Sequence, residues 1–187
     1  KTIDAIKNPD CGWFYTANQK DFEKIPGSPI GYWVSPNYMH TFDTKQFVLN
    51  NMQVKQGLAT GNNDEFLRFW SEVGCSKTGK DIGSCNEAIS SEYAWFPYNK
   101  GGGYKKWYGN QFYVIHFNTK AFEKLSKQGN NLPSRQYYFK ESITWSDIST
   151  GNFACRYSPK GFVFDVKGSS GFSKNIFYDI GLLNSIY

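Results

Sequence analysis

The chain has 187 residues, a net charge of +5 and 19% aromatic residues, 13 of them tyrosine. This length suits one domain, or one domain with a small appendage, that buries its own core. The sequence predicts neither a membrane span nor a signal peptide. The mild positive charge favours a polyanionic partner, although an ordinary basic soluble domain fits the composition equally well.

The first 43 residues predict short elements around a rigid connection. Gly12–Ala17 is an aromatic strand candidate, and Asp21–Lys24 is expected to form one helical turn. Ile25–Gly31 holds two prolines and two glycines, which excludes a regular helix or a central strand. Ser35 followed by Pro36 is a good helix start, because serine caps and proline fits the first helical position. We therefore expect a helix over residues 36–42.

A second helix is predicted over Asp64–Val73, where apolar residues recur at helical spacing. Asn62 and Glu65 form a capping-box-like start, and Gly74 is a natural stop. The preceding loop ends at Asn63, so that free backbone N–H groups would face a loop of Gly, Thr and Asn suited to a phosphate. The alternative interpretation is a well-capped helix without a ligand.

Residues 95–110, WFPYNKGGGYKKWYGN, are the strongest candidate for a contact surface. Three consecutive glycines allow a close approach of the backbone, and lysines alternate with tyrosine and tryptophan. Lysine neutralises phosphates, and the aromatic rings can stack on bases or lie along the sugar backbone. The alternative is a glycine hairpin with its aromatic side chains folded onto the core and its lysines solvated.

The next segments are predicted to be structural. Gln111–Phe117 is the most apolar strand candidate and is expected to be central in a sheet, with His116 as a structural histidine. Ala121–Lys127 is predicted to be a short helix that Asn118 or Thr119 caps and Gly129 ends.

A three-stranded meander is predicted over Ser142–Ile148, Phe153–Tyr157 and Phe162–Val166, because apolar residues alternate along the second and third runs. The turns between them are residues 149–152 and Ser158–Gly161, the second with proline at its second position. Arg156 is expected to project from the face opposite Phe153, Cys155 and Tyr157. The loop 167–171 resembles an anion-binding turn weakly, and the apolar residues 176–186 suggest a last helix that is cut short.

The cysteines do not predict a metal site, because none forms a CxxC pair and only two histidines accompany them. Cys155 lies at a core-facing strand position, where a reduced thiol is common. We expect four free thiols and a cytoplasmic location. A Cys75–Cys85 disulfide would instead fit a secreted protein. The cysteines are Cys11, Cys75, Cys85 and Cys155, and the histidines are His40 and His116.

Residues 137–172, YYFKESITWSDISTGNFACRYSPKGFVFDVKGSSGF, resemble the segment FKxGxTWSxxSxxxFxxRYxPxGFxFDxxG of large adenine-N6 DNA methyltransferases. These are the PglX-type enzymes of BREX phage-defence systems and fused type II restriction–modification enzymes. Three further blocks match in the same order: IPGSPIGYW at 25–33, VKQGLATGNNDEFLRFW at 54–70, and residues 95–110. Together they span most of the chain. The similarity of QGLATGNND to the family's QGLxTGDND favours the phosphate interpretation of that loop, where Asn62 replaces an aspartate.

The resemblance implies a C-terminal target-recognition region, cut from a longer methyltransferase and forming a single domain over residues 1–187. Its fold would be α+β, with a mixed or antiparallel sheet and short flanking helices. The sequence lacks a glycine-rich S-adenosylmethionine turn and an [ND]-P-P-[YF] loop, since Asn8-Pro9-Asp10 has no second proline and no aromatic residue. We therefore expect no catalysis and no cofactor in this piece, with S-adenosylmethionine bound by the parent enzyme.

The predicted function is recognition of a short sequence in double-stranded DNA for a catalytic domain of the same chain, with other defence-system subunits as further partners. Arg156 is the candidate for specificity, because it is expected to project from the face of the meander opposite its core residues, and arginine suits guanine. Two alternatives remain open: an aromatic-rich carbohydrate-binding module, secreted and disulfide-bonded, and a protein-docking domain. The predicted DNA contacts are Lys55, Gln56, Thr60, Asn62, Asn63, Asn99, Lys100, Tyr104, Lys105, Lys106, Trp107, Trp145, Arg156, Lys167 and Ser169.

Overall fold

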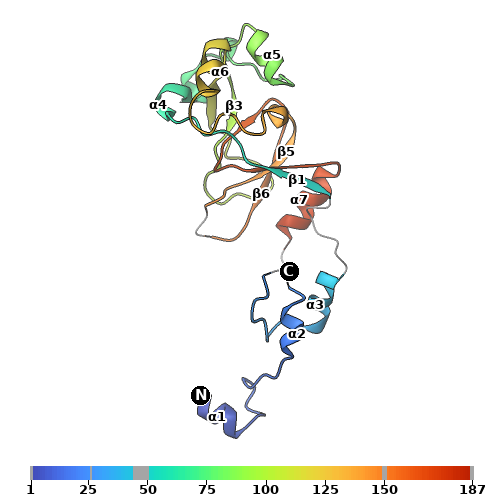
Figure 1. The fold of residues 1–187 in the computed structure, drawn as a ribbon. Coiled ribbons are helices and arrows are strands. Elements are labelled where there is room, and N and C mark those ends of the chain that lie inside the picture. Colours follow the sequence, from blue (N-terminus) through green and yellow to red (C-terminus); the bar gives the residue numbers. More distant parts are fainter. Residues whose placement is uncertain (1, 26, 44–50, 149–150, 186–187) are drawn as a thin grey trace. The chain divides into compact units, whose positions relative to one another are not determined.

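The computed structural model describes residues 2–25, 27–43, 51–148 and 151–185. Its backbone divides into two compact units, Lys1–Phe47 and Val48–Tyr187, and each is described by itself. The fold is α+β, with two four-stranded sheets and several short helices, as the sequence predicted (Figure 1). In the described part of the chain, no helix combines the length and the apolar character needed to cross a membrane.

The first unit consists of three short helices, α1 (Thr2–Lys7), α2 (Gln19–Phe22) and α3 (Pro36–Asp43). The predicted start of α3 is confirmed, because the Ser35 hydroxyl accepts a hydrogen bond from the backbone N–H of Tyr38 at 3.2 Å. The predicted strand at Gly12–Ala17 is wrong. Its residue Tyr15 makes a ring contact instead, with 5.1 Å between the ring centres of Tyr15 and Tyr32.

The first sheet of the second unit has the strand order β2-β4-β3-β7. These strands are β2 (Leu67–Phe69), β4 (Tyr113–His116), β3 (Trp95–Asn99) and β7 (Val163–Phe164). The central position predicted for Gln111–Phe117 is confirmed, because β4 pairs antiparallel with both β2 and β3. Fully buried Phe96 and Ile115 are paired across β3 and β4 and form the centre of the larger core.

The second sheet has the order β1-β8-β5-β6 and is antiparallel throughout. It contains β1 (Met52–Lys55), β8 (Ser170–Ser173), β5 (Ser142–Trp145) and β6 (Cys155–Ser158). The last helix, α7 (Ile176–Asn184), lies against β5, β6 and β8 (Figure 1). Met52, Ile143, Cys155, Ile176 and Ile180 form the smaller core between them.

The predicted meander is correct for two strands and wrong for the third. β5 and β6 form the expected antiparallel hairpin. The run 162–166 leaves this sheet, and its β7 pairs in parallel with β3 in the other sheet. The free edge of β5 is taken by β8, so Ser170 and Gly171, predicted to be part of a loop, are strand residues. Gly161, at a φ of +92°, turns the chain between the sheets. Residues 149–150 of the predicted turn lie outside the described residues.

The predicted helix over Asp64–Val73 is also wrong beyond its first turn. The structure has one turn, α4 (Asn63–Phe66), followed by β2 and the 3₁₀ turn η2 (Trp70–Glu72). Leu67 pairs with Ile115 on the edge of β4, and that sheet pairing replaces the continuation of the helix. The apolar spacing was misleading because Phe69 and Trp70 stay 50% and 59% exposed.

The remaining helices cover one end of the second unit near β3 (Figure 1). Helix α6 (Thr119–Leu125) confirms the prediction for 121–127, and Asn118 caps it by accepting from the backbone N–H of Ala121 at 3.0 Å. It contacts α5 (Cys85–Ser90), which the sequence analysis did not predict. Two further 3₁₀ turns are η3 (Cys75–Lys77) and η4 (Arg135–Tyr137).

Candidate nucleic-acid interface

The segment Gly101–Gly109, called the glycine loop here, connects β3 to β4 and lies along the outer edge of β6. The backbone N–H of Trp107 donates to the carbonyl of Cys155 at 3.0 Å, and the N–H of Tyr157 donates to the carbonyl of Trp107 at 2.8 Å. Gly101 has a φ of +80°, and a Cβ there would lie 2.8 Å from the carbonyl oxygen of Lys167. The loop is therefore held in place by the sheet and by a neighbouring loop.

The glycine loop exposes its aromatic side chains. Tyr104, Trp107 and Tyr108 are each more than half exposed, which fits the contact-surface interpretation for these three rings, whereas Tyr98 of the same stretch is fully buried in the core. The ammonium group of Lys105 lies 5.6 Å from the ring centre of Phe112, which is itself 46% exposed. Flat rings interspersed with cations on a fixed loop form a surface that suits a sugar–phosphate backbone or exposed bases.

Not every lysine of this surface is free to contact a ligand. The ammonium group of Lys106 donates to the carbonyl of Asn184 at 2.7 Å and so ties the glycine loop to the end of α7. Lys100 is half-buried with its ammonium 5.3 Å from the ring of Tyr113. Lys105 is exposed and is the most available cation of the loop.

Charge is distributed unevenly along the chain. Residues 48–187 contain sixteen lysines and arginines against eleven acidic residues, whereas residues 1–47 contain five of each. The whole net charge of +5 therefore belongs to the second unit. Within it, residues 93–122 include four lysines and no acidic residue, and the glycine loop lies inside this stretch. Its local field attracts anions.

Among the predicted site residues, Arg156 differs most from its expected position. Its side chain is 1% exposed, so it does not project from the sheet toward solvent as the sequence predicted. The guanidinium donates to the carbonyl of Lys105 at 3.4 Å and to the hydroxyl of Ser146 at 3.3 Å, while its Nε–H has no hydrogen-bond partner in the described structure. The glycine loop covers the edge of β6 and thereby buries this side chain. Burial lowers the pKa of Arg156.

A cleft of about 40 Å³ lies between Arg156, the glycines of the loop and Tyr104. Ser146, which the sequence analysis did not single out, accepts from Arg156 and donates to the carbonyl of Gly102 at 2.8 Å. In the described part of the chain no carboxylate pairs with Arg156. A buried cation that donates only to neutral oxygens retains most of its capacity to attract an anion.

A second loop, Lys167–Ser169, borders the same surface. A Cβ on Gly168 would lie 2.9 Å from both the carbonyl oxygen of Asn99 and the backbone nitrogen of Gly101, so the two loops are in close contact. Lys167 is exposed, but the hydroxyl of Ser169 donates to the carboxylate of Asp147 at 3.1 Å. Trp145 is partly exposed, and its ring centre lies 6.4 Å from that of Phe153. This edge of the surface is therefore less basic than the glycine loop.

Asn99 and Thr60 are buried and engaged within the protein, contrary to their predicted availability. The amide of Asn99 is 3% exposed and donates to the hydroxyl of Ser158 at 2.5 Å. Thr60 is 4% exposed and donates to the side-chain oxygen of Asn63 at 2.6 Å. Both residues hold loops to neighbouring segments, which is the commoner use of buried amides and hydroxyls.

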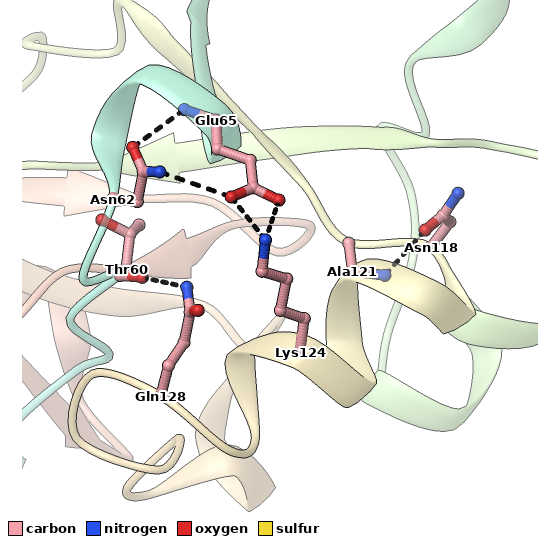
Figure 2. A network of polar contacts seen from close by, with 7 residues as sticks. All are labelled: Thr60, Asn62, Glu65, Asn118, Ala121, Lys124 and Gln128. Atoms are coloured by element: carbon pink, nitrogen blue, oxygen red, sulfur yellow. Dashed lines mark hydrogen bonds and ion pairs between the residues drawn. The ribbon is translucent and has the colours of Figure 1, made fainter.

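The predicted phosphate-binding turn, Thr60–Glu65, is a closed polar network (Figure 2). Asn62 accepts from the backbone N–H of Glu65 at 3.3 Å, which confirms the predicted cap, and its side-chain amide donates to the carboxylate of Glu65 at 3.4 Å. The same carboxylate forms an ion pair with Lys124 of α6 at 2.6 Å. The amide of Gln128 donates to the carbonyl of Thr60 at 2.8 Å. The carboxylate of Glu65 is therefore part of the turn that the sequence predicted to hold a phosphate.

Lys55 and Gln56 follow one another at the end of β1. The ammonium of Lys55 lies 5.0 Å from the ring centre of Tyr137, and Gln56 is exposed. No contact of either residue with the glycine loop is recorded in the described structure. The predicted DNA contacts therefore do not form one cluster. Those from Asn99 to Trp107 gather at or beside the glycine loop with Trp145, Arg156, Lys167 and Ser169, whereas Lys55, Gln56, Thr60, Asn62 and Asn63 lie elsewhere.

The thiols of Cys85 and Cys155 are not activated as nucleophiles. Burial raises the pKa of Cys85 and of Cys155 to about 11 each, so both are protonated at neutral pH. All four cysteines are unpaired, so Cys75 and Cys85 do not form the disulfide that the carbohydrate-binding alternative requires. Within the described ranges, no three His, Cys, Asp or Glu side chains converge as metal ligands would.

Comparison with known proteins places this chain beside two bacterial enzymes. It is 40% identical over 194 aligned residues to the adenine-specific methyltransferase PglX of Lacticaseibacillus casei strain Zhang, covering 98% of this chain and 16% of that protein. It is 38% identical over 192 residues to the adenine-specific methyltransferase BrxX of Escherichia coli O9:H4 strain HS, covering 100% of this chain and 15% of that protein. No family model matches the sequence.

The chain thus spans about one sixth of the length of these relatives. The matches cover the chain almost from end to end, including the glycine loop and both sheets. The resemblance predicted from the four sequence blocks is confirmed: this chain is homologous to one segment of the PglX and BrxX adenine-specific methyltransferases.

Proposed function

We propose that this chain is the DNA-recognition part of an adenine-specific DNA methyltransferase and that the glycine loop contacts double-stranded DNA. The observation that carries the proposal is the surface of the loop, where Tyr104, Trp107 and Tyr108 are exposed beside Lys105 in a stretch without acidic residues. The names of the two relatives support a role in adenine methylation.

The physical properties of the loop fit contact with a nucleic acid. Lysine neutralises phosphates and gives affinity that falls with rising salt, whereas aromatic rings add contacts to sugars and bases. The two backbone hydrogen bonds between Trp107 and β6 fix the loop before any ligand arrives. A fixed loop loses little conformational entropy on binding, so more of the contact energy appears as affinity.

Sequence recognition would then be separate from catalysis. The sequence has neither an [ND]-P-P-[YF] loop nor a glycine-rich cofactor turn, so the catalytic domain of the longer enzyme would hold S-adenosylmethionine and the target adenine. This segment would position the duplex for it. Other subunits of the defence system are further candidate partners.

The first experiment is selection of the chain against a randomised duplex pool at two salt concentrations. An enriched motif, with affinity that falls steeply as salt rises, would establish sequence-specific recognition by this segment alone. Salt-dependent binding without a motif would show that the segment binds DNA but needs the catalytic domain for specificity. No binding at low salt would overturn the proposal and favour the docking or carbohydrate-binding alternatives.

The glycine loop is tested by a charge-matched pair of double variants. Lys105→Gln with Lys167→Gln removes two exposed cations, one from the glycine loop and one from the loop that borders it, and Lys120→Gln with Lys127→Gln removes two exposed cations on and just after α6. Each lost phosphate contact should reduce the slope of log affinity against log salt by about 0.9. We expect the first pair to reduce the slope and the second to leave it unchanged. Equal effects would mean that only net charge matters.

A further inference from the structure

A cavity of about 650 Å³, which the proposed function does not use, lies against the β2-β4-β3-β7 sheet. Its floor is formed by Pro97 and Val114, which are paired across β3 and β4. Phe96 and Ile115, the next pair along the strands, face the buried core on the other side. The cavity is therefore built on the rigid centre of the sheet, and its volume is that of a site for a small molecule.

The walls of the cavity are aromatic. Trp70, Tyr157 and Phe162 line it, and Trp70 is 59% exposed. Trp70 is fixed at its backbone, where its N–H donates to the carbonyl of Phe112 at 2.9 Å. Aromatic walls around a volume of this size suit a flat ring, because each ring offers a face for stacking.

One residue of the cavity lining has a polar group without a partner. Gln111 lines the cavity, and its side-chain amide nitrogen is buried behind the cavity surface and has no hydrogen-bond partner in the described structure. A buried unpaired amide costs free energy that a ligand can recover by accepting its hydrogen bond. Glutamine presents a donor and an acceptor side by side, the pattern that pairs with two edge atoms of adenine.

Two lysines stand at the rim. Lys80 and Lys160 line the cavity and are exposed. Their segments are in close contact at Gly161, where a Cβ would lie 2.0 Å from the carbonyl oxygen of Lys80. Asp81 and Glu141 also line the rim, and Glu141 accepts from the hydroxyl of Tyr157 at 3.0 Å. A ligand with a neutral ring and a single phosphate matches this mixture better than a polyanion does.

We propose that this cavity binds an adenine nucleotide, with the base between the aromatic walls, its edge against Gln111 and its phosphate near Lys80 or Lys160. The nucleotide has two possible sources, a free mononucleotide or one unit of a DNA strand displaced from its helix. The second source rests on the proposed function. It is consistent with the position of the cavity, because Gln111 lies two residues after the glycine loop and the backbone N–H of Tyr157 donates to the carbonyl of Trp107 in that loop.

The first arm of the test titrates deoxyadenosine monophosphate into the chain by calorimetry. We expect binding, a preference over deoxythymidine monophosphate, and about tenfold weaker binding by Gln111→Met, since a good bidentate contact is lost. The matched control is Gln136→Met, an exposed glutamine of η4 outside the cavity. Trp70→Ala should weaken binding of both nucleotides. Equal affinity of the two glutamine variants would count against the free-nucleotide source.

The second arm compares a fully paired duplex with the same duplex carrying one unpaired adenine, whose displacement costs little. If the source is DNA, the chain binds the second duplex more tightly, and Gln111→Met removes the difference. A response in either arm supports the cavity and identifies its source. If Gln111→Met changes binding in neither arm, the proposal of a nucleotide site in this cavity is overturned. If the paired duplex still binds as tightly in that case, the proposed function stands without the nucleotide site.

Discussion

Two regions of the second unit carried the same prediction and have opposite properties. The turn Thr60–Glu65 and the glycine loop Gly101–Gly109 were both expected to contact phosphates. In the turn, Asn62, Glu65 and Lys124 satisfy one another (Figure 2). In the glycine loop, the backbone is bonded to β6 but the rings and Lys105 are exposed.

The difference shows that the polar groups of a motif can bind a ligand only when other groups of the protein do not already pair with them. The residues of the turn are those that cap and close a short helix, and α4 uses them for that purpose. The glycine loop leaves its three rings and Lys105 exposed, because the bonds that fix it involve its backbone and the side chain of Lys106. Breaking each region in turn should therefore affect folding in the first case and binding in the second.

The largest expected effect comes from Gly129, which lies against the turn. It has a φ of +60°, and a Cβ there would lie 2.0 Å from the carbonyl oxygen of Ala59. Gly129→Ala should lower the free energy of unfolding by about 3 kcal/mol or more, measured by urea denaturation. The matched change in the loop is Gly103→Ala, where a Cβ meets nothing within 4 Å and the expected change is under about 0.5 kcal/mol. Similar losses for the two would contradict the comparison.

Arg156 gives the next effect, and it should appear in binding. Arg156→Met keeps most of the buried volume and removes a desolvated charge without a carboxylate partner, so the free energy of unfolding should change by about 1 kcal/mol at most. The carbonyl of Lys105 loses its donor and the cleft loses its cation. DNA affinity should fall about tenfold, measured by fluorescence anisotropy on several duplex sequences.

The pattern across sequences decides the role of Arg156. Equal losses on all duplexes would fit a residue that positions the glycine loop or contacts phosphate. A loss confined to one base-pair position would restore the original prediction that Arg156 recognises a base. Unchanged affinity on every duplex would remove this residue from the interface.

Several elements could be predicted from sequence because their signals are local. The cap and length of α6 follow from Asn118 and Gly129, and the central strand β4 follows from its apolar run. The exposure of the glycine-loop aromatics was also among the two interpretations offered. Such features depend on residues within a few positions of one another.

The errors came from pairing over long distances. No residue near Phe162–Val166 indicates that Val163 pairs with Tyr98 rather than with β6. No residue near Arg156 indicates that residues 101–109 cover its side chain. Leu67 likewise follows a helical pattern but pairs with Ile115. Gln111 was assigned to a strand, and only the packing of five separate segments around it reveals an unpaired amide in a cavity.

A substitution at Asn62 distinguishes the capping interpretation of the turn from the phosphate-binding interpretation, and its expected effect on stability is smaller. Asn62→Ala removes the cap of α4 and its bond to Glu65, and should lower the free energy of unfolding by about 1 kcal/mol. DNA affinity should be unchanged, because Glu65 already occupies Lys124. Reduced DNA affinity with unchanged stability would instead revive the phosphate-binding prediction for this turn. Urea denaturation and anisotropy on the same preparation provide both values.

The smallest expected effect concerns His116, on the outer face of the first sheet near the turn. It stacks on Trp95 with 4.9 Å between ring centres, and burial lowers its pKa below the ordinary value, with Arg68 adding to the decrease and Glu65 opposing it. The unfolded chain therefore binds a proton at His116 more readily than the folded chain does. Stability from this residue is complete above the ordinary pKa of about 6.5 and declines as the pH falls below it.

His116→Phe retains a flat ring against Trp95 and has no proton to bind. Urea denaturation at a series of pH values should show a shallower loss of stability below about pH 6.5 for the variant than for the parent chain. Parallel curves would mean that the folded and unfolded chains hold this proton equally well. Because His116 lies beside Arg68 and Trp95 and away from the glycine loop, the DNA affinity of the variant at neutral pH should match that of the parent.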